Sequence, residues 1–504
     1  MAQEIRKFNS EELTSLTYEL PDEVLKYKMC GDFMGAKEAI ARWLERPVAE
    51  GMKERLRLEL VFLEQLREQF PYTKETAIAA FLPKVPDFTA RDLERLDRED
   101  LAEWIWLDGE KHYIHNIVRN ALGKDRELQE RAGLETEEAQ EKQILKDEIQ
   151  FMREKGSSTW RFHVRASIRL KEEEFYPGIV LKAHLPIPAK RYQVQEVNIL
   201  SYDLGMKAID PEDALFRTIY FEDTLQENRE FYVEYEYIVK AEYHDISRTG
   251  LENARRLADP QNLEYPEEMA EYLKEQYPHI RFSPYLRALA SQIVGNETDP
   301  LEKARKIYDY VTTKVHYSYM REYFLIEDIP QYCARNLRGD CGVQALLFIT
   351  LCRISGVPAK WQSGLYSHPC YIGAHDWAMF YVRPYGWLYA DPSFGGSAFA
   401  DNDEARREFY FGNLDPFRMP ANNAFQQTFL NPKQFLPIDP YDNQLGELES
   451  DRCGFNKDEV ESAKTLLEAV PGAQGSGSVH QGDRLRRRQY SLHYPTAAPL
   501  LYRR

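Results

Sequence analysis

The hydrophobic pattern of this chain changes its period about a third of the way along, and that change limits the folds open to it. Residues 52–66 carry apolar side chains at helical spacing. Residues 160–170 and 231–239 instead alternate apolar and polar side chains, which is typical of antiparallel strands with one buried face. We therefore expect a helical N-terminal region over residues 1–155 and an antiparallel β-sandwich domain over residues 156–246.

The part of the chain that follows mixes both patterns. A helix is expected to begin after Asp299, and strands are expected at residues 378–382 and 387–390, joined by a tight Pro-Tyr-Gly turn. Helices and strands are thus interspersed rather than segregated. The sequence therefore predicts an α+β fold whose third part is a mixed domain over residues 250–450.

Composition limits the partners and the compartment. A formal net charge of -17 argues against binding to nucleic acid or to anionic membrane surfaces. No apolar run approaches the ~20 residues of a membrane span, and no secretory signal is visible at the N-terminus. We therefore expect no membrane association and a cytoplasmic location. Residues 472–504 combine a Gly-Ser stretch with a run of arginines and are predicted to be a disordered tail.

Cysteine spacing and the absence of other motifs predict a protein without metal or cofactor. Six cysteines are spread over the chain without a Cys-x-x-Cys pair, which disfavours both a disulfide scaffold and a tetrahedral zinc site. No phosphate-binding glycine loop is present. His112 and His115, with Glu110, could share one helix face, but no third ligand is evident, so a solvated polar face is the favoured interpretation.

One arrangement of residues points to chemistry. Cys341 follows Gly339 and Asp340 at the start of the most apolar helix expected in the chain. His375 comes 34 residues later on an expected strand, and Asp391 comes 16 residues after that, at the end of the next strand. A cysteine, then a histidine, then a carboxylate, each at the end of a regular element, is the order that a papain-like thiol nucleophile needs.

Each of these residue types has a physical role in such a site. An imidazole can take the thiol proton and stabilise the thiolate as an ion pair, and a helix N-terminus adds partial positive charge. Because neighbouring strands lie about 4.8 Å apart, Asp391 can accept the other imidazole N–H and set the orientation of His375. Taken singly, Cys341 and His375 would more often be core residues and Asp391 a turn residue. Their combination favours catalysis.

Four segments of the chain together resemble the transglutaminase-like superfamily, of the bacterial type, within the papain-like cysteine-enzyme fold. They are Leu-Arg-Gly-Asp-Cys-Gly at 337–342, Arg-Ile-Ser-Gly-Val-Pro-Ala-Lys at 353–360, Ala-His-Asp-Trp at 374–377 and Gly-Trp-Leu-Tyr-Ala-Asp-Pro-Ser at 386–393. The resemblance is strong over about residues 290–400 and extends with less similarity to about 450, through a Phe-Gly-Asn-Leu-Asp-Pro-Phe-Arg segment.

The resemblance implies roles for the three residues. Cys341 would be the nucleophile, His375 the general acid and base, and Asp391 its orienting partner, in acyl transfer through a thioester. One departure is Asp376, where the family usually has a small residue before the tryptophan. We expect this carboxylate to perturb the pKa of His375.

The function that fits these features best is a cysteine hydrolase that acts on peptide or isopeptide amides of a protein or peptide substrate. Cross-linking by a protein-glutamine transglutaminase is the enzymatic alternative, because water and an amine compete for the same thioester. A non-catalytic binding module with a vestigial triad is the alternative of a different class. The Cys341 backbone N–H is the natural first oxyanion donor. For the second donor, Tyr317, Tyr319 and Gln331 stay open.

Overall fold

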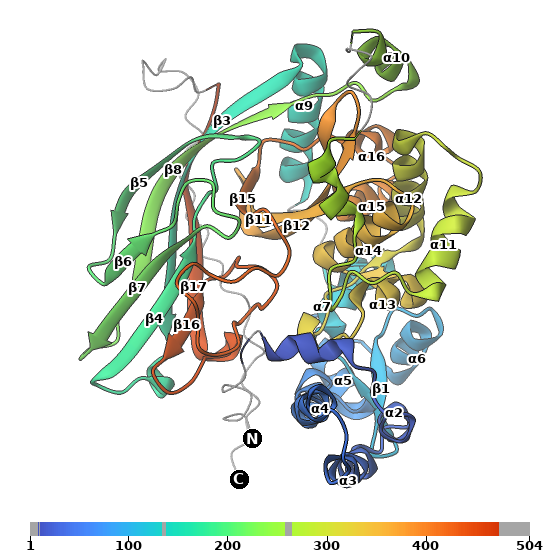
Figure 1. Ribbon diagram of the computed structural model, residues 1–504, viewed down its shortest axis with the longest axis vertical. Coiled ribbons are helices and arrows are strands. Elements are labelled where there is room, and N and C mark those ends of the chain that lie inside the picture. The colour runs from blue at the N-terminus through green and yellow to red at the C-terminus, as the bar shows by residue number, and fades with distance from the viewer. Residues whose placement is uncertain (1–8, 10, 134–137, 258–264, 473–504) are drawn as a thin grey trace.

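The computed structural model describes residues 9, 11–133, 138–257 and 265–472. Its architecture is α+β, in the order that the sequence predicts: a helical region, antiparallel sheets, and then a mixed core (Figure 1). The predicted disordered tail lies outside the described residues, apart from its first residue. No helix in the described ranges has the length and apolar character to cross a membrane.

The N-terminal region is helical except for one short hairpin. Its elements are η1 (Glu12–Thr17), α2 (Asp22–Met29), α3 (Phe33–Leu44), α4 (Glu50–Gln69), α5 (Lys74–Phe81), α6 (Ala90–Arg98), β1 (Trp104–Leu107), β2 (Glu110–Tyr113), α7 (Ile117–Leu122), α8 (Arg126–Arg131) and α9 (Glu138–Lys155). The helical spacing at residues 52–66 falls within α4, as predicted. The expectation that Glu110 and His112 lie on a helix is wrong, because both residues belong to strand β2, which pairs with β1.

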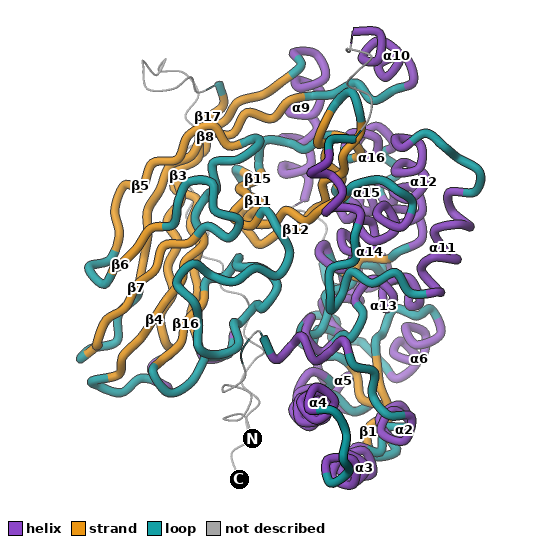
Figure 2. The backbone as a smooth tube through the Cα atoms, in the orientation of Figure 1, coloured by secondary structure: helices purple, strands orange, loops and turns teal. Residues whose placement is uncertain are grey.

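The β domain consists of two four-stranded antiparallel sheets, with orders β16-β4-β7-β6 and β17-β3-β8-β5 (Figure 2). The strands are β3 (Ser157–Leu170), β4 (Ile179–Pro186), β5 (Val194–Tyr202), β6 (Met206–Ile209), β7 (Thr218–Leu225), β8 (Phe231–Glu242), β16 (Glu447–Ser450) and β17 (Val460–Pro471), with the short turns η2 (Glu172–Glu174) and η6 (Lys457–Glu459) between them. The two-residue alternation of β3 corresponds to alternating burial.

Two strands of these sheets come from the far end of the chain. β17 pairs with β3 along its length, and β16 pairs with β4. The sequence expectation for the β domain covered only residues 156–246, so it did not include them. Because the chain returns to the sandwich after the mixed core, the core is tied to the β domain at both of its ends (Figure 1).

The mixed core is built on a five-stranded sheet of order β14-β13-β12-β11-β15. Its elements are α10 (Arg248–Leu257), η4 (Glu267–Leu273), α11 (Pro284–Val294), α12 (Pro300–Lys314), β9 (His316–Tyr317), η5 (Tyr323–Leu325), α13 (Ile329–Asn336), β10 (Arg338–Gly339), α14 (Cys341–Ile354), β11 (Ala359–His368), β12 (Tyr371–Val382), β13 (Gly386–Ala390), α15 (Pro392–Ala400), α16 (Glu404–Phe409), β14 (Phe411–Gly412) and β15 (Arg418–Asn422). In Figure 1 the sheet lies between these helices and the β sandwich.

Helix α14 lies in the centre of the core, which fixes the position of its first residue. Every residue from Gly342 to Arg353 is buried, and Phe348 contacts Phe380 of β12 with ring centroids 5.8 Å apart. Burial of a large apolar side chain contributes roughly 1.5–3 kcal/mol. The N-terminus of α14 is therefore held rigidly against the sheet.

The N-terminal region holds the segment that leads into α14. Asn120 accepts a hydrogen bond from the backbone N–H of Tyr319 at 2.7 Å and donates one to its carbonyl at 3.0 Å. Glu103 accepts hydrogen bonds from Arg321 at 2.7 Å and from Tyr332 at 2.8 Å. The helical region thus contacts the core directly beside the cysteine helix.

Candidate active site

Cys341 is the first residue of α14, as the sequence predicts. Asp340 caps the helix by accepting a hydrogen bond from the backbone N–H of Val343 at 3.3 Å, and its carboxylate also accepts one from the Tyr323 hydroxyl. The next residue has to be small. A Cβ added at Gly342 would lie 2.5 Å from the Tyr323 hydroxyl oxygen and 2.7 Å from Oδ2 of Asp376. The glycine therefore allows two polar side chains to approach the helix start.

His375 and Asp391 meet across neighbouring strands. The register of β12 and β13 pairs Ala378 with Ala390, so Asp391 follows the end of β13 beside the histidine strand. Nε2 of His375 lies 2.7 Å from Oδ2 of Asp391. The other carboxylate oxygen of Asp391 caps α15, accepting from the backbone N–H of Phe394 at 3.0 Å. One carboxylate thus fixes both the imidazole and the start of a helix.

A buried arginine lies behind this pair. Nη1 of Arg418 is 3.0 Å from Oδ2 of Asp391, and Nη2 is 3.0 Å from Asp415; all three side chains are fully buried. Burial disfavours the charge on Asp391, but its interactions with His375 and with the Arg418 guanidinium outweigh it and lower the pKa of Asp391 to about 2. Asp391 is therefore an anion at any physiological pH.

The pKa of His375 is also shifted. Burial lowers it, and the Asp391 carboxylate opposes that shift while Arg418 adds to it. The ring lies among aromatic side chains, with Trp377 stacked at 5.9 Å and Phe394 at 4.8 Å between ring centroids. The imidazole is thus held in the neutral form that can accept a proton.

The thiol of Cys341 faces a different carboxylate. It donates a hydrogen bond to Oδ2 of Asp376, with 3.2 Å between sulfur and oxygen. Gln444 donates from its side-chain amide to the other oxygen, Oδ1, at 2.5 Å, and to the backbone carbonyl of His375 at 3.0 Å. Burial and the nearby Asp376 and Asp340 carboxylates raise the pKa of Cys341 well above its ordinary value.

The structure brings two of the three predicted site residues into contact. His375 and Asp391 are hydrogen-bonded, whereas among the described hydrogen bonds none joins Cys341 to His375. The expectation that Asp376 perturbs the pKa of His375 is not confirmed, because that shift comes from burial and from Asp391, Arg418 and Asp415. The Asp376 carboxylate instead contacts the thiol of Cys341. The catalytic roles of Cys341, His375 and Asp391 stay a prediction.

Two further residues belong to this site. Arg418 ends the Asp-Pro-Phe-Arg segment to which the sequence resemblance extends, but its place beside Asp391 could not be read from spacing. Gln444 lies in the loop between β15 and β16, far from the other residues in sequence. Within the described part of the chain, no group of three or more His, Cys, Asp or Glu side chains is arranged to hold a metal ion.

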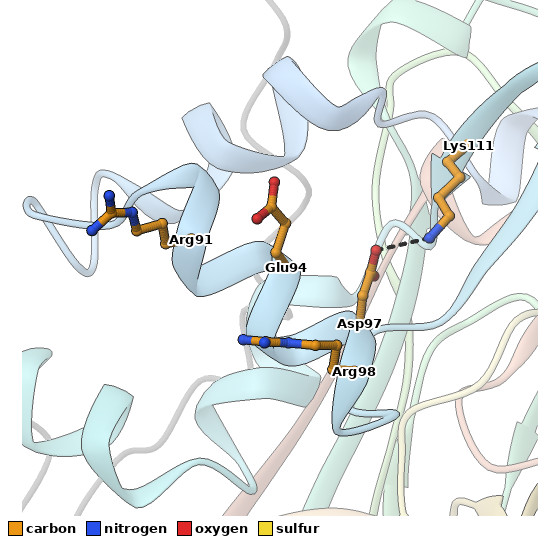
Figure 3. A pocket seen from close by; sticks show the side chains of 5 residues that line it. All are labelled: Arg91, Glu94, Asp97, Arg98 and Lys111. Carbon is orange, nitrogen blue, oxygen red and sulfur yellow. Dashed lines mark hydrogen bonds and ion pairs between the residues drawn. The ribbon is translucent and has the colours of Figure 1, made fainter.

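A hollow of about 470 Å³ lies elsewhere, in the N-terminal region. Arg91, Glu94, Asp97, Arg98 and Lys111 line it. Figure 3 shows these side chains on α6 and β2, with Lys111 paired to Asp97. None of them belongs to the Cys341 or His375 surroundings, so this hollow is separate from the candidate site.

Comparison with known families and proteins identifies the domain that carries the site. Residues 287–392 match the transglutaminase-like superfamily, and this range includes Cys341, His375 and Asp391. A protein of Haemophilus influenzae without an assigned function is 23% identical over 227 residues. The match covers 38% of this chain and 60% of that protein, so the chain spans less than two thirds of the relative's length.

Solved structures are also similar over part of the chain. A candidate cysteine protease of Cytophaga hutchinsonii is 13% identical with a TM-score of 0.39, over 63% of this chain and 92% of that one. The periplasmic domain of TgpA from Pseudomonas aeruginosa is 12% identical with a TM-score of 0.26, over 52% and 96%. A candidate protease of Parabacteroides distasonis is 13% identical with a TM-score of 0.19, over 46% and 63%.

Proposed function

We propose that this chain, whose residues 287–392 are a transglutaminase-like domain, is a cysteine-dependent hydrolase of peptide or isopeptide amides. The observation that carries the proposal is the His375–Asp391 hydrogen bond of 2.7 Å, in the same domain as a cysteine at the N-terminus of a buried helix. Asp391 orients the imidazole, and Arg418 keeps that carboxylate ionised.

The chemistry is acyl transfer in two steps. The Cys341 sulfur attacks the amide carbonyl, its proton passes through His375 to the leaving nitrogen, and the C–N bond breaks to give a thioester and a free amine. Water then adds to the thioester, the C–S bond breaks, and the thiol regains its proton. The backbone N–H of Cys341, at the helix start, is placed to stabilise the oxyanion.

The first test is to trap the acyl-enzyme. The protein is incubated with a peptide library and quenched in acid, and the mass added to the Cys341 peptide is measured. We expect acylation of the wild-type chain and none of the Cys341→Ala variant. Release of new carboxyl termini with water as acceptor would support hydrolysis. Wild type and variant that both leave every peptide intact would overturn the proposal.

Transamidation uses the same thioester, so it is tested in the same reaction. A primary amine such as cadaverine is added in increasing concentration, and incorporation into the product is compared with hydrolysis. Hydrolysis predominates under our proposal. An amine product that exceeds the acid at millimolar amine would instead identify a cross-linking enzyme.

A non-catalytic binding module is favoured by one observation, the contact of the Cys341 thiol with Asp376 rather than with His375. The binding-module hypothesis predicts that a thiol-reactive amide electrophile labels Cys341 no faster than the partly buried Cys370. We expect Cys341 to be labelled faster when a substrate-like peptide carries the electrophile.

We place the enzyme in the cytoplasm. Cys30, Cys333, Cys341, Cys352 and Cys453 form no disulfide in the described structure, and a reducing environment protects a thiol nucleophile from oxidation. Fractionation of the cells that produce the protein tests this assignment, and recovery with periplasmic or secreted markers would contradict it.

A further inference from the structure

The thiol of Cys341 contacts a carboxylate, that of Asp376, which has no role in the proposed reaction. The thiol donates to Asp376, and Gln444 holds that carboxylate from its other side. Asp376 is only 5% exposed and so cannot turn freely into water. Its contact with the sulfur is therefore part of the packed structure.

The groups around this contact are almost all acids. Asp340 and Tyr323 face it from the loop before α14 and from η5, and Tyr317 from β9. Asp439 and Asp442 face it from the loop between β15 and β16, where Asp442 is buried and Asp439 is half-buried. The adjacent His375 of β12 is bonded to Asp391. In the described structure no lysine or arginine is ion-paired with Asp376.

We infer that Asp376 restrains the nucleophile: its carboxylate holds Cys341 in the thiol form, and the thiolate forms only when this carboxyl is neutral or has moved off the sulfur. The physical reason is simple. A thiolate 3.2 Å from a carboxylate would place two anions in contact inside the protein. A protonated carboxyl can instead donate its own hydrogen to the sulfur.

The carboxylate itself is poised to change its charge. Burial, with the neighbouring Asp340 next in size, raises the pKa of Asp376 to about 7. The carboxyl therefore changes its charge near neutral pH, below the pH at which the thiol loses its proton, and the two titrations are coupled. The inference rests on the proposed role of Cys341 as nucleophile, but its test needs no turnover.

The test is the pH dependence of Cys341 alkylation. Wild type, Asp376→Asn and Asp376→Ala are treated with iodoacetamide from pH 6 to 11, and modification of the Cys341 peptide is followed by mass spectrometry. We expect the midpoint in the variants to fall by about one pH unit or more, so that alkylation at pH 7 becomes about tenfold faster. The midpoint is the criterion, because a smaller side chain also widens access to the sulfur at every pH.

Asp210→Asn is the matched control. Asp210 is another buried aspartate, 4% exposed, hydrogen-bonded to Thr218 in the β domain, and its replacement should leave the Cys341 midpoint at the wild-type value. Circular dichroism and thermal unfolding confirm that each variant is folded, and Asp376→Ala substitutes if the asparagine variant is not.

The outcomes separate this inference from the proposed function. An unchanged or higher midpoint in both Asp376 variants overturns the inference, as does slower alkylation at pH 7, which would make Asp376 a base. A lower midpoint in a protein that cleaves no peptide keeps the restraint and overturns the hydrolase. Cleavage together with an unshifted midpoint does the reverse.

Discussion

Asp376 and Asp391 are both buried and both lie within hydrogen-bond distance of a proposed catalytic side chain, yet their pKa values shift in opposite directions. Asp391 has Arg418 at 3.0 Å and His375 at 2.7 Å, and its pKa falls to about 2. Asp376 has a thiol and an amide as partners and other carboxylates nearby, and its pKa rises to about 7. A nearby cation, rather than depth of burial, decides which carboxylate stays charged.

The largest expected effect comes from removing the charge of Asp391. Asp391→Asn keeps the shape but leaves His375 without its anionic partner, and we expect peptide hydrolysis to fall about 10⁴-fold, as it does when this group is changed in hydrolase triads. Turnover of the best library peptide measures it. Asp401→Asn, at the exposed end of the same helix α15, should stay within twofold of wild type. An Asp391→Asn variant with a tenth of wild-type activity would contradict an orienting role.

Removing the cation should affect stability. Arg418→Met leaves Asp391 and Asp415 buried without their partner, which costs about 3–5 kcal/mol of unfolding free energy. Because the folded pKa of Asp391 lies below its unfolded value, the ionised Asp391 stabilises the wild-type protein fully above about pH 4. The variant loses this stabilisation. Urea unfolding should therefore show a deficit at pH 7 that narrows as the pH falls toward 2.

Arg169→Met is the control for that measurement. Arg169 pairs with Glu461 on the surface of the β domain, where both side chains are about half exposed. Such a pair contributes about 0–1 kcal/mol. Equal losses for the two arginine variants would show that the buried pairing around Asp391 is unimportant.

The sequence predicts the surroundings of Asp391 better than those of Asp376. Strand periodicity and the turn at residues 383–386 place His375 beside Asp391, because a hairpin register follows from local pattern. The contact of Asp376 with the sulfur depends on which face of β12 packs against α14. The partners Arg418 and Gln444 come from β15 and from the loop after it. Such long-range contacts leave no periodic signal.

The domain outline has the same limit. The alternation of residues 160–170 predicts a strand, and β3 is that strand. One neighbour of β3 is β8, and the other is β17, some 300 residues further along. Local pattern reports that a strand has a buried face, but it does not report which distant strand completes the sheet.

Neutralising Asp376 should stabilise the protein, in contrast to Asp391. Because its folded pKa lies above its unfolded value, ionisation of Asp376 costs stability as the pH rises from about 4 through 7. Asp376→Asn should therefore raise the unfolding free energy by on the order of 2 kcal/mol at pH 8, after loss of its hydrogen bonds is allowed for. The gain should vanish at pH 4. A loss of stability at pH 8 would mean that the carboxylate is better accommodated than its surroundings indicate.

The smallest expected effect probes the packing that holds Asp376 against the sulfur. In Gly342→Ala the new Cβ would lie 2.7 Å from Oδ2 of Asp376 and 2.9 Å from Trp361. The carboxylate must move. The free-energy cost of this strain should exceed the stabilisation from the higher helix propensity of alanine by about 1 kcal/mol. Urea unfolding measures the loss, and alkylation should show the Cys341 midpoint shifting toward that of Asp376→Asn.

Gly396→Ala in α15 is the matched change, because the Cβ there would meet only the Thr312 carbonyl at 3.6 Å, an ordinary contact. It should stabilise the protein by about 0.5–1 kcal/mol and leave Cys341 alkylation unchanged. If both glycine variants are stabilised and neither shifts the alkylation midpoint, the carboxylate has room to move at no cost. The contrast between the two aspartates would then reflect charge alone and not the fixed position of Asp376.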